Sequence, residues 1–343
     1  MISTIYIEEE VRDHTRTLEI CGRFPNASIV WCDRYSSVFN SNSQNFRLQK
    51  QQPSLILAKK HKGRVLSTPP GYGIGVGENY YFSHMMNCLY DCRYCFLQGM
   101  YRSAHYVVFV NYEDFFADIS RVASSAVESS AVESDRVESN NKESCWFFSG
   151  YDCDSLAMEP VTGFIDACLE HFCNLQNAHL EVRTKSTQIR SLLNRRPIAN
   201  CVIGYSFTAE RTASRLEHKA PSVTKRIAAL AKLQKHGWKV GLRLDPLIFT
   251  ENFASDYREL LDKIFANIEP TELHSVSYGA FRLPKPFFKR MIALYPEERL
   301  FATTLTENNP VVSYPDEIEQ QCLDTVKNLL TDRIDPSILF PCS

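Results

Sequence analysis

Three of the twelve cysteines of this 343-residue chain lie within one short segment, at Cys88, Cys92 and Cys95. Their spacing is C-x3-C-x2-C, and three thiolates on a short curled loop can converge on a single iron–sulfur cluster. Three protein ligands leave one iron of a four-iron cubane open, so that this iron could bind a reacting molecule. The spacing therefore predicts a [4Fe-4S] centre held by Cys88, Cys92 and Cys95.

Zinc is an alternative for the same residues, because His84 stands four positions before Cys88. Structural zinc usually takes four Cys or His ligands in two pairs, and the sequence has no second C-x2-C or H-x3-H pair. A disulfide framework is disfavoured, because an odd triplet cannot pair with itself and disulfides belong to oxidising compartments. A second interpretation of these residues, from a different functional class, is a non-catalytic zinc- or cluster-binding module that binds nucleic acid.

The cysteine segment, with aromatic Tyr94 just before its last cysteine, resembles the cluster loop of radical S-adenosylmethionine enzymes. Its flanks, residues 93–98 and 106–114, resemble more narrowly the spore photoproduct lyase family, over roughly residues 50–300. The resemblance implies a carbon–carbon lyase whose cofactors are a [4Fe-4S] cluster and S-adenosyl-L-methionine, and which generates a 5′-deoxyadenosyl radical. It further implies repair of a thymine-dimer photoproduct in DNA.

The resemblance also implies the residues that would bind S-adenosylmethionine. Tyr94 would lie near the adenine, Lys185 would face the methionine carboxylate, and Ser206 corresponds to a serine of the next strand. Many members of the superfamily place a Gly-Gly-Glu motif after the second strand, where this chain has Ser-Gly-Tyr-Asp. Asp152 or Asp154 could supply the missing carboxylate.

The family's repair reaction returns a hydrogen atom from a cysteine that follows the second strand. In this chain that position falls nearer Tyr151, and Cys153 is the neighbouring thiol. A hydrogen-atom donor must be a protonated thiol, and the carboxylates of Asp152 and Asp154 would raise the pKa of Cys153. Cys153 is therefore the candidate catalytic residue, and a buried structural thiol is the alternative.

The elements that must position these residues alternate along the chain. Strand-like runs at residues 144–148, 179–184, 201–207, 238–244 and 275–279 are separated by helix-period segments at 161–174, 187–194, 222–236 and 255–267. Such alternation predicts an α/β protein with a parallel sheet covered by helices. The resemblance implies a partial (β/α)6 TIM-like barrel of the radical S-adenosylmethionine type.

The predicted organisation has three parts. Residues 1–75 form a small N-terminal α/β cap with a basic and glycine-rich lead-in, 76–300 the partial barrel, and 301–343 a C-terminal extension. A five-residue repeat, rich in Ser and Glu, predicts a mobile insertion at 124–143.

Composition limits the partners and the compartment. Charged residues make up 23% of the chain and the net charge is −2, so DNA binding would need a local basic face, for which residues 59–64 and 282–290 are candidates. The expected partners are damaged DNA and an electron donor such as flavodoxin or ferredoxin.

The absence of a signal peptide or a run of about 20 apolar residues predicts a cytoplasmic protein without a membrane anchor. The alternative enzymatic function is the same radical chemistry on another nucleic acid, a protein or a small molecule.

Overall fold

The computed structural model describes residues 2–69, 72–74, 77–133, 144–308 and 310–342. The chain divides into two compact units. The first unit comprises Met1–Thr68, Val76–Leu89 and Tyr101–Val182. The second comprises Pro69–Gly75, Tyr90–Met100 and Arg183–Ser343. The residue ranges expected above for the cap, the barrel and the extension stay a prediction.

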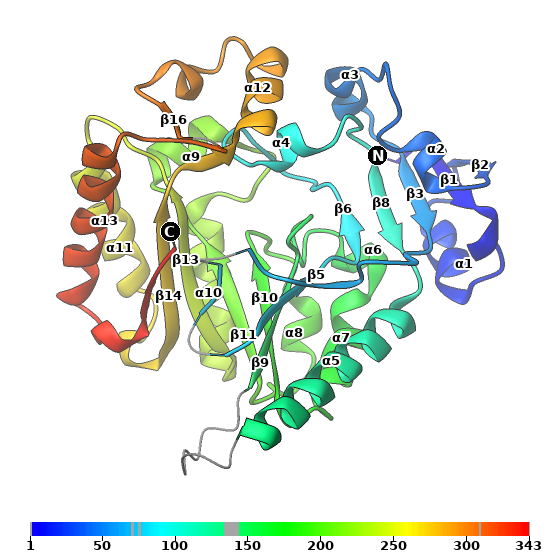
Figure 1. The fold of residues 1–343 in the computed structure, drawn as a ribbon, viewed down its shortest axis with the longest axis horizontal. Helices are drawn as coiled ribbons and strands as arrows, with labels where there is room; N and C mark the ends of the chain where they lie inside the picture. Colours follow the sequence, from blue (N-terminus) through cyan, green and yellow to red (C-terminus); the bar gives the residue numbers. More distant parts are fainter. Residues whose placement is uncertain (1, 70–71, 75–76, 134–143, 309, 343) are drawn as a thin grey trace. The chain divides into compact units, whose positions relative to one another are not determined.

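The N-terminal part of the first unit is a five-stranded sheet in the order β2-β1-β3-β8-β6 (Figure 1). Its first four strands are parallel and β6 is antiparallel to β8. Both β3 and β8 are buried at every residue, as parallel strands covered on both faces must be. Three of its strands, β1, β2 and β3, lie within the residues for which the N-terminal α/β cap was expected. The bounds are β1 Thr4–Glu8, β2 Ser28–Cys32, β3 Leu55–Ala58, β6 Met85–Met86 and β8 Tyr106–Phe109, with helices α1 Thr15–Gly22, α2 Tyr35–Val38 and α3 Phe46–Gln51.

The same unit contains the strands β4, β5, β9 and β10 in this spatial order. β5, β9 and β10 are parallel, and β4 is antiparallel to β5. The aromatic strand β9 is buried throughout, and the polar residues that follow it begin the segment that carries Asp152 and Cys153. The bounds are β4 Val65–Ser67, β5 Asn79–Phe82, β9 Cys145–Ser149 and β10 Ala178–Thr184, with helices α5 Tyr112–Glu133, α6 Glu159–Thr162 and α7 Phe164–Phe172.

Helix α5 reaches into the five-residue repeat. The backbone is helical to Glu133, so residues 124–133 of the expected mobile insertion continue α5. Residues 134–143, the rest of that predicted segment, lie outside the described residues.

The second unit is built on the parallel strands β11, β13, β14 and β18, in this order. β11 is buried at all six positions, and β14 at seven of its eight. The strands expected at 201–207, 238–244 and 275–279 are therefore confirmed, as are those expected at 144–148 and 179–184 in β9 and β10. The bounds are β11 Cys201–Ser206, β13 Lys239–Leu247, β14 Leu273–Ala280 and β18 Leu339–Pro341.

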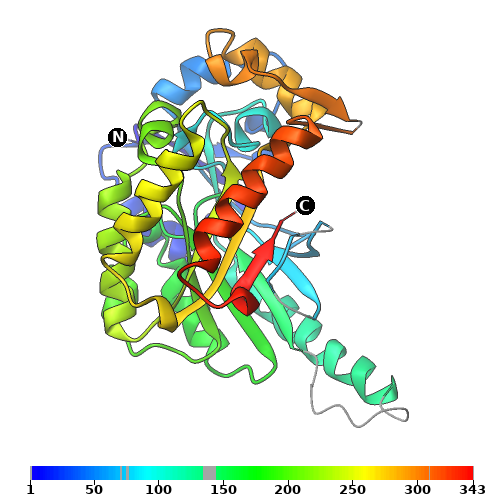
Figure 2. The ribbon, with the colours of Figure 1, turned by 90° about the vertical axis from the view of Figure 1, so that its left-hand side faces the viewer.

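Helices of the second unit cover these strands. Figures 1 and 2 show α11 and α13 running side by side, and both helices bury one apolar face. Ser222 caps α10, and the helix stops at Gly237, whose positive φ suits the left-handed turn after a helix. The bounds are α4 Leu97–Met100, α8 Arg190–Leu193, α9 Glu210–Leu216, α10 Val223–His236, α11 Phe253–Phe265, α12 Lys285–Leu294 and α13 Asp316–Thr331.

Two small antiparallel sheets complete the second unit. β7 (Asp91–Cys92) pairs with β12 (Glu217–His218), and β17 (Val311–Ser313) lies between β15 (Arg282–Pro284) and β16 (Thr306–Asn308). The first of these sheets includes one of the three cysteines.

Candidate functional site

The cysteine loop is fixed to the second unit through the two-residue strand β7. Cys92 lies opposite Glu217 in the pairing with β12, and the backbone N–H of Arg93 donates to the carbonyl of Leu216 at 2.8 Å. The N–H of Cys95 then donates to the carbonyl of Cys92 at 3.0 Å, which closes a turn between the two cysteines. The turn fixes the backbone that carries these two thiols.

Helix α4 begins two residues after Cys95 and is hydrogen-bonded to α12. Arg290 Nη1 donates to the carbonyl oxygens of Gly99 and Met100, at 2.7 and 3.0 Å. A Cβ at Gly99 would lie 2.4 Å from the carbonyl oxygen of Phe287, so only glycine permits this approach of the two helices. The end of the cysteine loop is therefore fixed by a segment almost two hundred residues away.

Tyr94, between the two cysteines, is buried and hydrogen-bonded at its hydroxyl. The hydroxyl donates to Glu217 Oε1 and lies 3.2 Å from Thr208 Oγ1. Glu217 Oε2 in turn accepts from Arg226 Nη2 in an ion pair whose two side chains are both 1% exposed. Burial, followed by the charge of Glu217, raises the pKa of Tyr94, so the phenol stays protonated.

Lys185 follows β10 and lies over the ring of Tyr94, with 5.5 Å from Nζ to the ring centroid. Burial alone lowers the pKa of Lys185, but the negative charges of Cys92 and Glu217 outweigh it, so the pKa is raised. Ser206 is the last residue of β11 and is buried, and its carbonyl accepts from Arg226 Nη1 at 3.0 Å. Within the second unit, Tyr94, Lys185 and Ser206 are thus joined by one network.

Sequence reasoning did not anticipate Glu217, Arg226 and Thr208, which hold this network together. None belongs to a motif, and Glu217 and Arg226 occur as ordinary charged residues in a segment with many charges. The signal that identifies them is burial with pairing, because a charged side chain is almost never fully buried without a partner.

In the first unit, Asp152 is buried after β9. Its backbone N–H donates to Ser83 Oγ at 3.0 Å, and its carboxylate accepts a hydrogen bond from Tyr101. Burial raises the pKa of Asp152, against the opposing effect of Lys60. The carboxylate of Asp154 instead caps the next turn, accepting from the N–H groups of Leu156 and Ala157 at 3.0 and 2.9 Å. Of the two candidate carboxylates, that of Asp154 is thus occupied in capping a turn, whereas that of Asp152 has no such role in the described structure.

Cys153 is 7% exposed and packs in the apolar core of the first unit, beside residues such as Met85 and Val108. Burial is the main cause that raises its pKa, followed by the charges of Cys88, Asp152 and Asp154. The thiol is therefore held protonated, as expected from the two flanking carboxylates.

Tyr151 is the residue nearest to the expected position of the family's donor cysteine. Its ring packs against Tyr81 with centroids 4.3 Å apart. Cys88 belongs to the same unit and is partly exposed.

His84, the extra residue of the zinc alternative, is 1% exposed and stacks on Phe164 with ring centroids 3.9 Å apart. Burial lowers its pKa to about 3. Within the described ranges, no group of three His, Cys, Asp or Glu side chains is gathered closely enough to hold a single metal ion.

The basic segments expected to form a DNA-binding rim are largely paired within the protein. Lys59 Nζ contacts Glu10 at 2.8 Å and Arg64 Nε contacts Asp118 at 2.7 Å. In the second segment, Arg282 donates to the carbonyl of Cys342 at 3.0 Å, and Lys285 pairs with Glu307.

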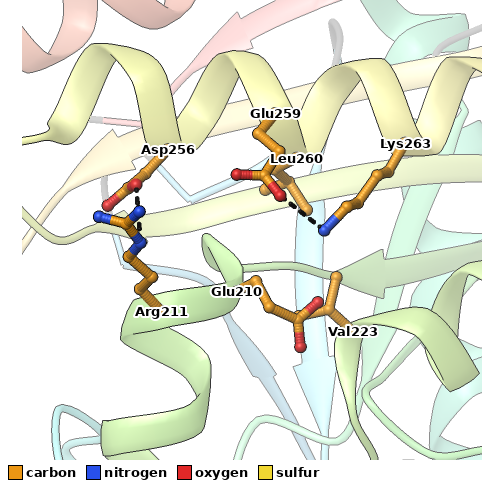
Figure 3. Close-up of a pocket in the computed structure, with 7 residues that line it drawn as sticks. All are labelled: Glu210, Arg211, Val223, Asp256, Glu259, Leu260 and Lys263. Atoms are coloured by element: carbon orange, nitrogen blue, oxygen red, sulfur yellow. Dashed lines mark ion pairs between the residues drawn. The ribbon is translucent and has the colours of Figure 1, made fainter.

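A separate pocket of about 160 Å³ lies among α9, α10 and α11 in the second unit (Figure 3). Four of the five charged residues that line it form two ion pairs: Lys263 contacts Glu259 at 2.8 Å, and Arg211 lies 3.7 Å from Asp256. None of the predicted site residues lines it. Among the described helices, none is long and apolar enough to span a membrane.

The fold is that of an α/β protein built on parallel strands. The sequence model of the family described as spore photoproduct lyase matches residues 77–309. The chain belongs to this family, which confirms the family expected from the cysteine loop. The family comprises radical S-adenosylmethionine lyases with a [4Fe-4S] cluster, so the enzyme class and the two cofactors expected above are confirmed with it.

Individual relatives agree with the assignment. The chain is 22% identical over 303 residues to a spore photoproduct lyase of Bacillus subtilis (strain 168), covering 86% of this chain and 83% of that protein. It is 24% identical over 197 residues to a spore photoproduct lyase of Clostridium acetobutylicum, covering 57% of this chain and 54% of that protein.

Solved structures extend the likeness over the whole chain. A spore photoproduct lyase mutant with bound AdoMet and dinucleoside spore photoproduct superposes with a TM-score of 0.82 at 18% identity, covering 100% of this chain and 98% of that one. A spore photoproduct lyase complexed with the dinucleoside spore photoproduct gives 0.81 at 19% identity, with the same coverage. The fold is shared, and the expected partial barrel is confirmed.

Proposed function

We propose that this protein is a radical S-adenosylmethionine lyase that repairs a thymine-dimer photoproduct in DNA. The observation that carries the proposal is the buried network of Tyr94, Glu217 and Arg226 beside Cys92, with Lys185 over the Tyr94 ring. Together with family membership, this network supports a site for a charged, adenine-bearing cofactor next to a cluster. The relatives named above, which are called spore photoproduct lyases, support the substrate.

In this proposal Cys88, Cys92 and Cys95 are the protein ligands of the cluster. When bound, the cluster and S-adenosylmethionine supply a 5′-deoxyadenosyl radical that abstracts a hydrogen atom from the lesion. The turn between Cys92 and Cys95 and the hydrogen bonds of α4 to Arg290 fix the loop, so little ordering is left to occur when the cluster binds.

Four further residues orient the cofactor. The raised pKa of Lys185 keeps its ammonium charged, which suits a methionine carboxylate. The ring of Tyr94 is available to the adenine, and Ser206 can donate its hydroxyl at the end of β11. Asp152 is assigned to the methionine amino group, because Asp154 caps a turn.

Cys153 is the proposed hydrogen-atom donor to the substrate radical. Its raised pKa keeps the S–H bond intact at neutral pH, which a donor of hydrogen atoms requires. The donor position of the family is expected to fall nearer Tyr151 than Cys153, and this offset favours a second candidate function: the same radical chemistry on a different substrate. A family member in which the donor position is a tyrosine could return the hydrogen atom by a different route or act on a different molecule.

Anaerobic reconstitution tests the proposal. The protein is expected to hold about four irons per chain, to release 5′-deoxyadenosine on reduction, and to convert an oligonucleotide that carries the spore thymine lesion back to two thymines. A reconstituted protein that cleaves S-adenosylmethionine but leaves this lesion intact would support the second candidate.

The physiological reductant and the location of the protein belong to the same proposal. We assign a flavodoxin or ferredoxin as electron donor and the cytoplasm as compartment. Replacing the chemical reductant by purified flavodoxin or ferredoxin with its reductase should sustain the release of 5′-deoxyadenosine. No release with either protein would reject this electron donor.

A further inference from the structure

Glu217 is the buried carboxylate of the second unit's cofactor network. Its side chain is 1% exposed, and its two oxygens have different partners: Oε1 accepts from Tyr94 and Oε2 from Arg226. A buried charge lacks the solvation of water, so it is tolerated only where such partners replace water.

The backbone of Glu217 is part of the same site. It pairs with Cys92 across β7 and β12, so one residue fixes the start of the cysteine turn by its backbone and the Tyr94 ring by its side chain. Arg226 then extends the network to the carbonyl of Ser206. Glu217 thereby connects two residues assigned to the cofactor, Tyr94 and Ser206, and the third, Lys185, lies over the Tyr94 ring that Glu217 holds.

We propose that Glu217 is the positioning residue of the S-adenosylmethionine site, because its carboxylate holds the Tyr94 ring under Lys185 and thereby sets the affinity for this cofactor. The inference rests on the proposed function and extends it to a residue outside the cysteine motif. Glu217 does not touch the cofactor itself and acts through Tyr94 and Lys185. A neutral residue of the same shape would fill the same space without holding the two groups in place.

The variant Glu217→Gln tests this directly, since it keeps the shape and the backbone pairing with Cys92 but removes the charge. Exposed Glu259 on α11, paired with Lys263, provides the matched control Glu259→Gln. For each reconstituted protein, three quantities are measured: iron per chain, the thermal unfolding midpoint of the cluster-free protein, and the dissociation constant for S-adenosylmethionine by equilibrium dialysis. The electron paramagnetic resonance spectrum of the reduced cluster, with and without S-adenosylmethionine, gives an independent readout of binding.

We expect Glu217→Gln to keep its iron while its dissociation constant for S-adenosylmethionine rises about tenfold, the effect of losing one charge-assisted interaction. The spectral change caused by S-adenosylmethionine should then need correspondingly more cofactor. Tyr94→Phe, which removes only the hydroxyl, should raise the dissociation constant for S-adenosylmethionine to a similar extent. Because both substitutions break the same hydrogen bond, the double variant should have a dissociation constant no higher than the higher of the two single-variant values. Glu259→Gln should match wild type.

The inference is overturned if Glu217→Gln binds S-adenosylmethionine within twofold of wild type. It is overturned equally if the variant loses iron and stability together while its cluster-loaded fraction binds normally, because Glu217 would then be only structural. These outcomes differ from failure of the proposed function. Wild type that holds iron but binds no S-adenosylmethionine would reject the proposed enzyme, and wild type that binds the cofactor but leaves the lesion intact would reject only the substrate.

Discussion

Arg290 and Gly99 are 191 residues apart in sequence, yet Arg290 Nη1 lies 2.7 Å from the carbonyl oxygen of Gly99 and donates a hydrogen bond to it. The same nitrogen donates to the carbonyl of Met100 at 3.0 Å. One side chain thus satisfies two carbonyl groups at the end of α4, where a helix of four residues cannot satisfy them internally.

Arg290→Ala should therefore loosen the cysteine loop from its distal end. Loss of hydrogen bonds from a charged donor to partly buried carbonyls should cost about 1.5–3 kcal/mol of unfolding free energy. It should also lower the iron retained after reconstitution. Urea unfolding and an iron assay measure the two effects. Lys289→Ala removes an exposed charge from the same helix and should change neither; equal behaviour of the two variants would contradict the role given to Arg290.

Gly99→Ala tests the close approach of α4 and α12. A methyl group 2.4 Å from the Phe287 carbonyl oxygen must displace backbone, so the variant should lose about 1–3 kcal/mol of unfolding free energy. Gly22→Ala, at the end of α1, meets nothing within 4 Å and should be neutral or slightly stabilising. Thermal unfolding followed by circular dichroism compares them. A Gly99→Ala protein as stable as Gly22→Ala would show that the two helices can move apart freely.

His84 predicts a loss of stability in acid. The ring is neutral in the folded protein because burial lowers its pKa to about 3, below the unfolded value of about 6.5. The contribution of neutral His84 to the free energy of unfolding is therefore fully present above pH 6.5. As the pH falls from 6.5 toward 3, the free energy of unfolding decreases by at most about 1.4 kcal/mol per pH unit.

His84→Phe should flatten this acid dependence. The substitution keeps the stack on Phe164, and no hydrogen-bond partner of His84 Nδ1 would be lost among the described residues. Urea unfolding at pH 7.5, 6 and 5 gives the dependence for wild type and variant. His236→Gln, at an exposed position at the end of α10, is the control. Wild-type stability that does not change between pH 7.5 and 5 would disprove the assignment.

Cys153 can be tested as the hydrogen-atom donor through isotope exchange. Thiol protons exchange with solvent, so repair in D2O should place deuterium in one product thymine if Cys153 returns the atom. Cys153→Ala should abolish this incorporation and divert the substrate to by-products, as liquid chromatography with mass spectrometry would detect. Cys173→Ala removes an exposed cysteine and should leave both unchanged. Unaltered deuterium in the Cys153→Ala product would exclude Cys153 as the donor.

The cysteine motif and the alternation of strands and helices were sufficient to predict the family and the fold, because both are local patterns. Lys185 and Ser206 could be placed at strand ends for the same reason. Glu217, Arg226 and Arg290 could not, because their roles depend on burial and on contacts with distant segments. The candidate rim at residues 59–64 stays a prediction: the sequence shows its positive charge, but not that Glu10 pairs with Lys59 and Asp118 with Arg64.

The long-range supports of the cysteine loop also determine when it can form during synthesis. Cys92 pairs with Glu217, and the carbonyl of Gly99 accepts a hydrogen bond from Arg290. Both partners come late in the chain, so the loop gains the last of these contacts only when most of the chain has left the ribosome. A nascent chain that ends before residue 290 carries Cys92 and Cys95 on an incompletely held segment. The cysteine loop therefore has its full set of backbone supports only after α12 has been synthesised.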